Sequence, residues 1–169
     1  MVDLDNINDI KLVNVKRILD EYALKFQELA KKKIVDNDNV ATGNLLASIK
    51  TSIDFGGNKY TVYLHSREYL KYIEEGTKPH FPPPDKILQW VKDKKLPTRE
   101  STGDKSLPTE KQLTYLVCRK ISIHGTEPNG LIAETQEQLN EIYIKRLEEA
   151  LTQDIVNWLP IIKIELRFK

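Results

Sequence analysis

The sequence has a single cysteine, Cys118, among 169 residues, so no disulfide can form within the chain. This cysteine lies in an apolar helical pattern between Leu113 and Ile121. Because a reactive thiol needs an electropositive and partly exposed setting, the pattern favours a buried structural thiol over a nucleophile. The sequence also has no uninterrupted apolar run near the roughly 20 residues that span a bilayer. The acidic residues 1–6 lack the apolar core of a signal peptide, so we expect a soluble protein made in a reducing cytoplasm.

An excess of charge of one sign is also missing. Lys and Arg number 26 against 25 Asp and Glu, which leaves a net charge of +1. A dedicated duplex-DNA binder usually carries a basic excess, so this balance argues against that class, though not against a protein that DNA merely passes. With 30% charged and 40% apolar residues, the composition is typical of a soluble domain that buries a core. The length predicts one domain over residues 1–169.

The first element that the sequence predicts is a long amphipathic helix over about residues 9–33. Its apolar side chains recur at three- and four-residue intervals, which places them on one buried stripe: Leu12, Val15, Leu19, Tyr22, Phe26 and Leu29. Three lysines at 31–33 close the pattern. Cations interact favourably with the C-terminal end of a helix dipole, so we interpret this run as an end signal rather than a nucleic-acid patch.

A helical turn and a β-hairpin are expected next. Thr42 or Asn44 could cap a single turn that brings Leu45 and Ile49 to one face. The period then changes to two, because apolar or β-branched residues alternate with polar ones on both sides of a Gly-Gly-Asn turn at 56–58. The alternating residues are Ile49, Thr51, Ile53 and Phe55, then Tyr60, Val62 and Leu64.

The central part of the sequence predicts short helices and irregular connections. A helix over about 68–75 ends at Gly76, and the proline-rich residues 77–84 follow in a non-helical loop. Asp85 is the expected cap of a helix that carries Trp90 and ends near residues 96–97. Residues 98–106 are polar and lack periodicity, so we expect an exposed, mobile loop there.

The last third of the sequence predicts two helices and a strand. Thr109 begins a helix with Gln112 in the capping-box position, and Gly125 ends it. A long helix over about 131–151 has a predicted buried face of Leu139, Ile142, Tyr143, Leu147 and Leu151. Residues 155–159 either prolong it or form a separate turn, and residues 161–168 predict a final strand after Pro160.

The predicted fold class is therefore α+β, with a small and largely antiparallel sheet made of the hairpin and the C-terminal strand. Long N-terminal and C-terminal helices pack on that sheet. Residues 79–109 form an inserted Pro-rich and polar segment, and residues 160–169 form a C-terminal arm.

No residue pattern in the sequence favours catalysis or a bound cofactor. The run from Gly103 to Ser106 lacks the earlier glycine of a phosphate-binding loop. The three histidines, His65, His80 and His124, have no partner at metal-ligand spacing. Glu74 and Glu75 are adjacent and point to different faces of a helix, so they cannot form a facing acid–base pair; Glu75 could pair with a cation near the turn. Both tryptophans, Trp90 and Trp158, are expected in the core, and neither Ser48 nor Ser122 has a neighbouring general base. We therefore expect no enzyme, no metal and no cofactor.

Three segments carry a resemblance to a known group. They read Thr42-Gly-x-Leu-x-x-Ser-Ile49, then Tyr69-x-x-Tyr-Ile-Glu-x-Gly-Thr77, then Ile121-x-x-x-Gly-Thr-x-Pro128. In this order and spacing they resemble the neck proteins of tailed bacteriophages, called head–tail connector, tail-completion or head–tail joining proteins. The resemblance covers roughly residues 10–155. The inserted segment at 79–109 and the extended C-terminal strand depart from compact members of the group.

The resemblance implies a structural α+β virion protein, synthesised in the host bacterial cytoplasm and located in the virion neck or tail. It would form a cyclic homo-oligomer, six- or twelve-fold, between portal or connector proteins and tail-tube or tail-hub proteins, with DNA passing through without sequence-specific binding. The matching positions are structural: Thr42, Gly43, Leu45, Ser48, Ile49, Tyr72, Glu75, Gly76, Thr77, Gly125 and Thr126. We expect the loop at 98–106 and the final strand to order on contact with neighbours, the strand by adding to a sheet edge. The contact residues are Arg99, Lys105, Ile162, Ile164, Leu166 and Phe168.

Two other classes remain as alternatives. One is a small DNA- or RNA-associated factor that uses a basic segment consisting of Lys92, Lys94, Lys95, Arg99 and Lys105. The other is a hydrolase or transferase that uses His80 or His124. A salt-sensitive gel shift would support the first, and activity lost on a single His→Ala change would support the second.

Overall fold

The computed structural model describes residues 12–37, 42–56 and 59–158. These residues form seven helices and a two-stranded antiparallel sheet, which confirms the α+β class. The elements in chain order are α1 (Val13–Asp36), α2 (Asn44–Ser48), β1 (Lys50–Gly56), β2 (Lys59–His65), α3 (Tyr69–Glu75), α4 (Pro84–Asp93), α5 (Arg99–Thr102), α6 (Glu110–His124) and α7 (Leu131–Trp158).

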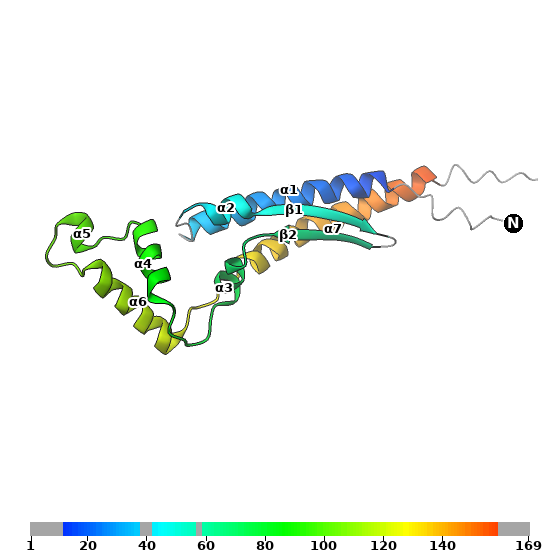
Figure 1. The fold of residues 1–169 in the computed structure, drawn as a ribbon. Coiled ribbons are helices and arrows are strands. Elements are labelled where there is room, and N and C mark those ends of the chain that lie inside the picture. The colour runs from blue at the N-terminus through cyan, green and yellow to red at the C-terminus, as the bar shows by residue number, and fades with distance from the viewer. Residues whose placement is uncertain (1–11, 38–41, 57–58, 159–169) are drawn as a thin grey trace, which may run out of the picture.

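The molecule has two parts (Figure 1). The long helices α1 and α7, the β1–β2 hairpin and the short helices α2 and α3 form an elongated body. Helices α4, α5 and α6 form a smaller lobe at one end of that body. Among the described residues, no helix is both long enough and apolar enough to cross a membrane.

The core of the body lies between α1 and α7. The two helices run antiparallel, since Asp154 bonds to Asn14 at one end and Glu134 pairs with Lys33 at the other. The buried residues of this cluster are Val15, Ile18, Phe26, Ala30, Leu139, Tyr143 and Ala150. The predicted stripe of α1 is confirmed, because Val15 and Phe26 are buried and its other members are half-buried against them.

The predicted buried face of α7 is partly wrong. Leu139 and Tyr143 are buried, and Leu147 packs against the cluster. Ile142 and Leu151, however, are 54% and 43% exposed. Ile142 and Leu151 are nine residues apart, which corresponds to two and a half helical turns, so they point in opposite directions. They therefore lie on opposite flanks of the stripe that meets α1.

A second buried cluster explains where α1 ends. Ile34 is fully buried together with Leu45, Ile49, Leu70 and Leu131. Burial of Ile34 keeps the chain helical to Asp36, past the predicted end at about residue 33, and Lys33 lies in the last turn, where a cation was expected. Residues 9–11 of the predicted helix lie outside the described residues. So do the predicted final strand at 161–168 and the arm at 160–169, while α7 itself is prolonged to Trp158.

The N-terminus of α1 receives its cap from the far end of the chain. Leu12 occupies the capping position and offers no side-chain acceptor. Instead Asp154, which is buried on α7, accepts hydrogen bonds from the backbone N–H groups of Asn14 and Val15 at 3.1 and 3.0 Å, and from the Asn14 amide at 2.7 Å. A carboxylate at this position satisfies free N–H groups and interacts favourably with the helix dipole.

The predicted hairpin is confirmed, with Ile53 opposite Val62 and Phe55 opposite Tyr60. Gly56, expected in the turn, is the last residue of β1 and pairs with Lys59. The hairpin is joined to α1 through β1, because the Thr51 hydroxyl donates to the Ala23 carbonyl at 3.1 Å. The face expected to be buried is half-buried near the base of the hairpin and exposed at Phe55 and Tyr60 near its tip. Turn residues 57 and 58 lie outside the described residues.

Two of the predicted helix caps are wrong. Helix α2 has Gly43 in the capping position with φ +76°, and neither Thr42 nor Asn44 caps it with a side chain. The nearest interaction is a long hydrogen bond of 3.5 Å from the Asn44 N–H to the Thr42 hydroxyl. Leu45 and Ile49 are nevertheless buried together, as expected.

Helix α4 begins earlier than predicted, at Pro84, with Pro83 in the capping position, so Asp85 lies in the first turn instead of capping it. Proline is tolerated there because the first N–H groups of a helix have no intrahelical partner. The helix ends at Asp93, short of the expected 96–97.

Residues 99–106 are exposed, as expected, but the segment is not wholly a loop, because it contains the short helix α5. Thr98 is 1% exposed and forms a capping box with Ser101, which begins the short helix α5. The Arg99 guanidinium donates to the carbonyls of Lys105 and Leu107 at 3.0 and 3.3 Å, so the segment is held by its own hydrogen bonds. The predicted capping box at Thr109 and Gln112 and the helix end at Gly125 are confirmed in α6.

Candidate functional site

The two Gly-Thr pairs of the sequence meet where the lobe joins the body. Gly76 ends α3 and Gly125 ends α6, each with positive φ. The residues that follow them, Thr77 and Thr126, form an antiparallel bridge with N–H to carbonyl distances of 3.0 and 3.1 Å. Their hydroxyl oxygens are also 3.0 Å apart. We call these four residues the corner.

Both glycines are needed for the close approach of backbones at the corner. A Cβ added to Gly76 would lie less than 3.0 Å from the Thr126 carbonyl oxygen. A Cβ added to Gly125 would likewise lie less than 3.0 Å from the Thr77 carbonyl oxygen. These contacts are with backbone, which cannot swing aside as a side chain does. The glycines therefore do more than end two helices, because they let two segments of chain touch.

Glu74 links the corner to the N-terminus of α7. Its carboxylate accepts the backbone N–H groups of Ile132 and Ala133 at 2.8 and 2.9 Å. The backbone of α3 also accepts from this region, because the Asn129 N–H donates to the Ile73 carbonyl at 3.0 Å. Helix α3 is therefore held against the start of the longest helix.

The segment that carries the resemblance, Tyr69-x-x-Tyr-Ile-Glu-x-Gly-Thr77, has its glutamate at position 74, whereas the structural position expected from it was the neighbouring Glu75. Glu75 is exposed, and its only described partner is Lys71, with 3.9 Å between the charged atoms. That distance makes a weak surface pair. The motif itself distinguishes the two glutamates, but the contact that Glu74 makes could not be recognised from it, because the helix that Glu74 caps begins more than 50 residues later.

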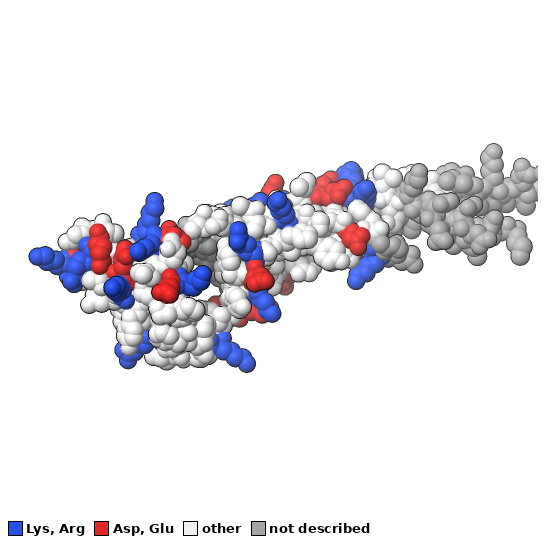
Figure 2. Space-filling model, in the orientation of Figure 1, with Lys and Arg blue, Asp and Glu red and all other residues white. Residues whose placement is uncertain are grey.

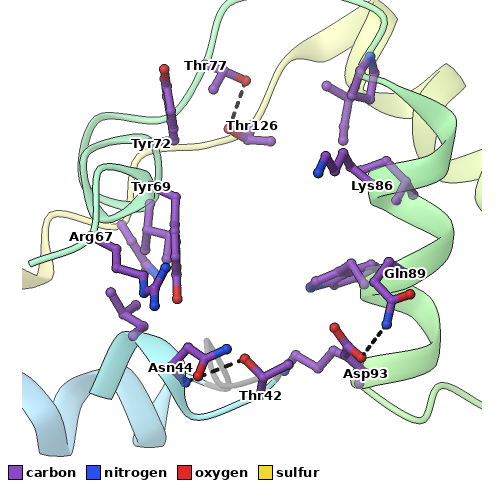
Figure 3. Close-up of a pocket in the computed structure, with 18 of the residues that line it drawn as sticks. Thr42, Asn44, Arg67, Tyr69, Tyr72, Thr77, Lys86, Gln89, Asp93 and Thr126 are labelled. Atoms are coloured by element: carbon purple, nitrogen blue, oxygen red, sulfur yellow. Dashed lines mark hydrogen bonds between the residues drawn. The ribbon is translucent and has the colours of Figure 1, made fainter. Parts of the chain in front are cut away.

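A groove lies below the corner, between the body and the lobe (Figure 3). Its volume is about 810 Å³. The body wall includes Asn44, Arg67, Tyr69 and Tyr72, and the wall on α4 includes Lys86, Gln89, Trp90 and Asp93. Figure 3 shows the Thr77–Thr126 pair above the opening between these walls.

The lining of the groove combines aromatic and aliphatic surface with polar groups. Tyr69, Tyr72 and Trp90 all expose a large part of their rings. The core position predicted for Trp90 is therefore wrong, whereas Trp158 is half-buried. On α4 the Gln89 amide donates to the Asp93 carboxylate at 2.8 Å, so these polar groups are held along their own helix. Aromatic walls with a few polar groups are typical of a binding groove.

The segments that carry the family resemblance come together around this groove. Thr42, Gly43 and Leu45 line it at the start of α2, Tyr72 lines it from α3, and the two corner threonines, Thr77 and Thr126, line it just after α3 and α6. The Ser48 hydroxyl accepts the Arg67 N–H at 3.2 Å, and Ile49 is fully buried behind it. Of the predicted contact residues, Arg99 and Lys105 lie together in the lobe, and the four C-terminal ones lie outside the described residues.

Cys118 is fully buried on α6, which confirms the prediction of a structural thiol. Its sulfur lies 3.9 Å from the Pro82 carbonyl oxygen. Burial raises the pKa of the thiol, so it stays protonated and is a poor nucleophile at neutral pH.

Two of the three histidines, His65 and His80, have ordinary hydrogen-bond partners. His65 Nε2 lies 2.7 Å from the Ser52 hydroxyl across the hairpin, and His80 Nδ1 lies 2.9 Å from the Lys78 carbonyl oxygen. In the part of the chain that the structure describes, no group of three or more His, Cys, Asp and Glu side chains could hold a metal ion.

The basic segment of the lobe is interspersed with acidic residues (Figure 2). Lys92 pairs with Glu110 at 3.5 Å, and the Arg99 guanidinium is used within the lobe.

Comparison of the chain with models of protein families, with curated proteins and with solved structures found no match.

Proposed function

We propose that this chain is a structural virion protein of the phage neck, a ring subunit that joins head to tail around the DNA channel. The observation that carries the proposal is the corner. Three segments far apart in the sequence carry the resemblance to neck proteins. Two of them meet at the corner, and the third, at residues 42–49, lines the same groove. Residues that merely ended separate helices would have no reason to meet in this way.

The surface of the molecule supports a role in assembly. Large apolar side chains are exposed on both parts, including Tyr115, Leu116 and Ile123 on α6, and Ile144, Leu151 and Ile155 on α7. Extended exposed apolar surface marks sites of protein–protein interaction. A subunit with unlike apolar surfaces at its lobe and along its body is suited to head-to-tail contacts, which close into rings by rotation.

The charge distribution suits a channel that DNA slides through. The net charge is +1, and cations and anions alternate on the face that Figure 2 shows. Tight DNA binding requires many free cations that neutralise phosphates. Two members of the basic segment, Lys92 and Arg99, are engaged within the lobe, which makes the nucleic-acid factor the weaker alternative.

The test is loss of the protein from the phage or prophage that encodes it. We expect filled heads and separate tails in electron micrographs, because the joining ring is missing. A control with the gene supplied in trans should restore joined particles. Normal infectious virions without the protein would contradict the proposal. For the purified chain, we expect a concentration-dependent ring of six or twelve copies by native mass and negative-stain imaging.

A further inference from the structure

The hairpin leaves one edge open. The Thr51 N–H donates to Gln27 Oε1 at 3.1 Å, so the backbone of Thr51 points toward α1 and away from β2. In an antiparallel ladder, pairs that bond to each other alternate with pairs whose backbone groups face outward. The outward-facing pairs are therefore Thr51–Leu64, Ile53–Val62 and Phe55–Tyr60.

The two edges of this sheet differ. Helix α1 lies along β1 and is bonded to it at Thr51. Among the described residues, no hydrogen bond joins the outward-facing backbone groups of Tyr60, Val62 or Leu64 to another element. An exposed strand edge of this kind is a template for a further strand.

Helix α7 exposes apolar side chains on the same side of the body as the sheet. Glu21 pairs with Arg146, whereas the carbonyl of Ala23 bonds to β1. Residues two apart on an α-helix point about 200° apart, so the Glu21–Arg146 pair lies on the side away from the sheet. On α7, Ile144 is two residues from Arg146, so by the same spacing it points away from the Glu21–Arg146 pair and toward the side of the sheet.

Ile144 belongs to a row at seven- and four-residue spacing, which one helix face presents together. The row consists of Ile144, Leu151 and Ile155, which are 53%, 43% and 41% exposed. Among the described residues, the chain therefore leaves about half of the surface of each of these side chains exposed. A third strand next to β2 would lie over this row, as β1 lies beside α1.

The sequence after α7 has the composition of such a strand. Residues 162, 164, 166 and 168 are Ile, Ile, Leu and Phe, and they alternate with Lys163, Glu165 and Arg167. A period of two places the apolar residues on one face and the charged ones on the other. The eight residues 161–168 also match the seven residues of β2 in length.

We propose that residues 161–168 of one copy add as a third strand to the outer edge of β2 of a neighbouring copy, antiparallel to it. The apolar side chains of the segment then cover the Ile144–Leu151–Ile155 row of the neighbouring copy. The charged side chains of the segment face solvent. This strand exchange rests on the proposed function, since it names the contact that links successive ring subunits.

The direction of α7 favours a neighbouring copy over the segment's own chain. Asp154 lies beside Asn14, and Lys16 lies over the ring of Phe55 near the hairpin tip. Helix α7 therefore ends at the tip, as Figure 1 shows. A segment that starts there and folds back along its own β2 would run parallel to it, because β2 also runs away from the tip. Antiparallel pairing is slightly more stable and is open to a second copy.

Cysteine crosslinking in the full chain tests the exchange. One copy carries Tyr63→Cys on β2, and a second copy of different tag length carries Lys163→Cys, Glu165→Cys or Arg167→Cys. We expect a disulfide between the two copies for at least one of the three positions. Glu28→Cys on α1 replaces Tyr63→Cys as the control and should not crosslink. No disulfide at any position would overturn the proposal, as would a chain carrying both cysteines that closes only on itself.

Matched variants separate the strand edge from side-chain packing. Val62→Pro removes an outward-facing N–H without removing a β1–β2 hydrogen bond, and Val62→Ala keeps that N–H. We expect the crosslink to be lost with proline and kept with alanine. Leu151→Lys should weaken self-association about tenfold, while Ile142→Lys on the opposite flank should not change it. Equal effects within each pair would overturn the proposal.

The outcomes also distinguish this inference from the proposed function. A ring that persists with no crosslink overturns strand exchange and leaves the neck function standing. If the two copies crosslink but virions are normal without the protein, strand exchange stands and the neck function is overturned.

Discussion

At the corner, Gly76 and Gly125 bring the ends of α3 and α6 into backbone contact. Positive φ alone would favour glycine there, but positive φ also occurs at Gly103, where an added Cβ would meet nothing within 4 Å. The corner glycines must in addition leave room for the carbonyl groups of Thr77 and Thr126, which a Cβ would clash with. The same residue type is therefore required for different physical reasons at different positions.

Alanine substitution should separate these two demands. Gly125→Ala or Gly76→Ala should lower the free energy of unfolding by about 3 kcal/mol or more, because strain and a backbone clash add. Gly103→Ala should cost only about 1 kcal/mol, since it brings strain without a clash. Urea unfolding followed by circular dichroism measures both. Equal losses at the three positions would show that close approach does not matter.

At the scale of elements, both long helices receive their N-terminal caps from distant carboxylates. Asp154 of α7 caps α1, and Glu74 of α3 caps α7. Each cap satisfies N–H groups that have no partner within their own helix. The caps also fasten elements to each other, so the antiparallel α1–α7 pair is joined at one end by Asp154 and held to α3 at the other by Glu74.

Removing these caps should destabilise the body unequally. Asp154→Ala should cost about 2 kcal/mol, because it leaves buried N–H groups unsatisfied. Glu74→Ala should cost about 1 kcal/mol, and the neighbouring Glu75→Ala should stay within about 0.5 kcal/mol. Chemical denaturation of the three variants provides the comparison. If Glu75→Ala proved as harmful as Glu74→Ala, the capping role of Glu74 would be wrong.

At the scale of the whole molecule, the lobe is connected to the body by two segments of chain that lie next to each other. Thr77 and Thr126 are bridged there, and the residues between them form the lobe. Both buried clusters of the body consist of residues outside that stretch. The body therefore has a core of its own, and the groove exists only where the two parts face each other.

Replacing residues 78–125 with Asn-Gly should leave a folded body. The bridged threonines would then flank a two-residue hairpin loop, for which Asn-Gly is a favoured sequence. We expect helical circular dichroism from α1 and α7 and a cooperative thermal transition within a few degrees of that of the full chain. A molten or unfolded product would show that the lobe is needed for the body to fold.

The sequence by itself determined the features that depend on near neighbours. The period of apolar residues located α1, the hairpin and α7, and the Thr109–Gln112 pair located the start of α6. Each of these signals acts over a few residues, within reach of one helical turn or one strand pair. Gly76 and Gly125 were likewise predicted as helix ends from their own surroundings.

Only the tertiary structure decided which residues meet across the chain. It brought the two Gly-Thr pairs together, placed Glu74 at the start of α7 and Asp154 at the start of α1, and turned Trp90 toward a groove. The partners in these contacts are separated by tens of residues or more, so neither member carries a local sign of the other. The groove is the clearest case, because its walls come from two parts of the molecule that each fold by local rules.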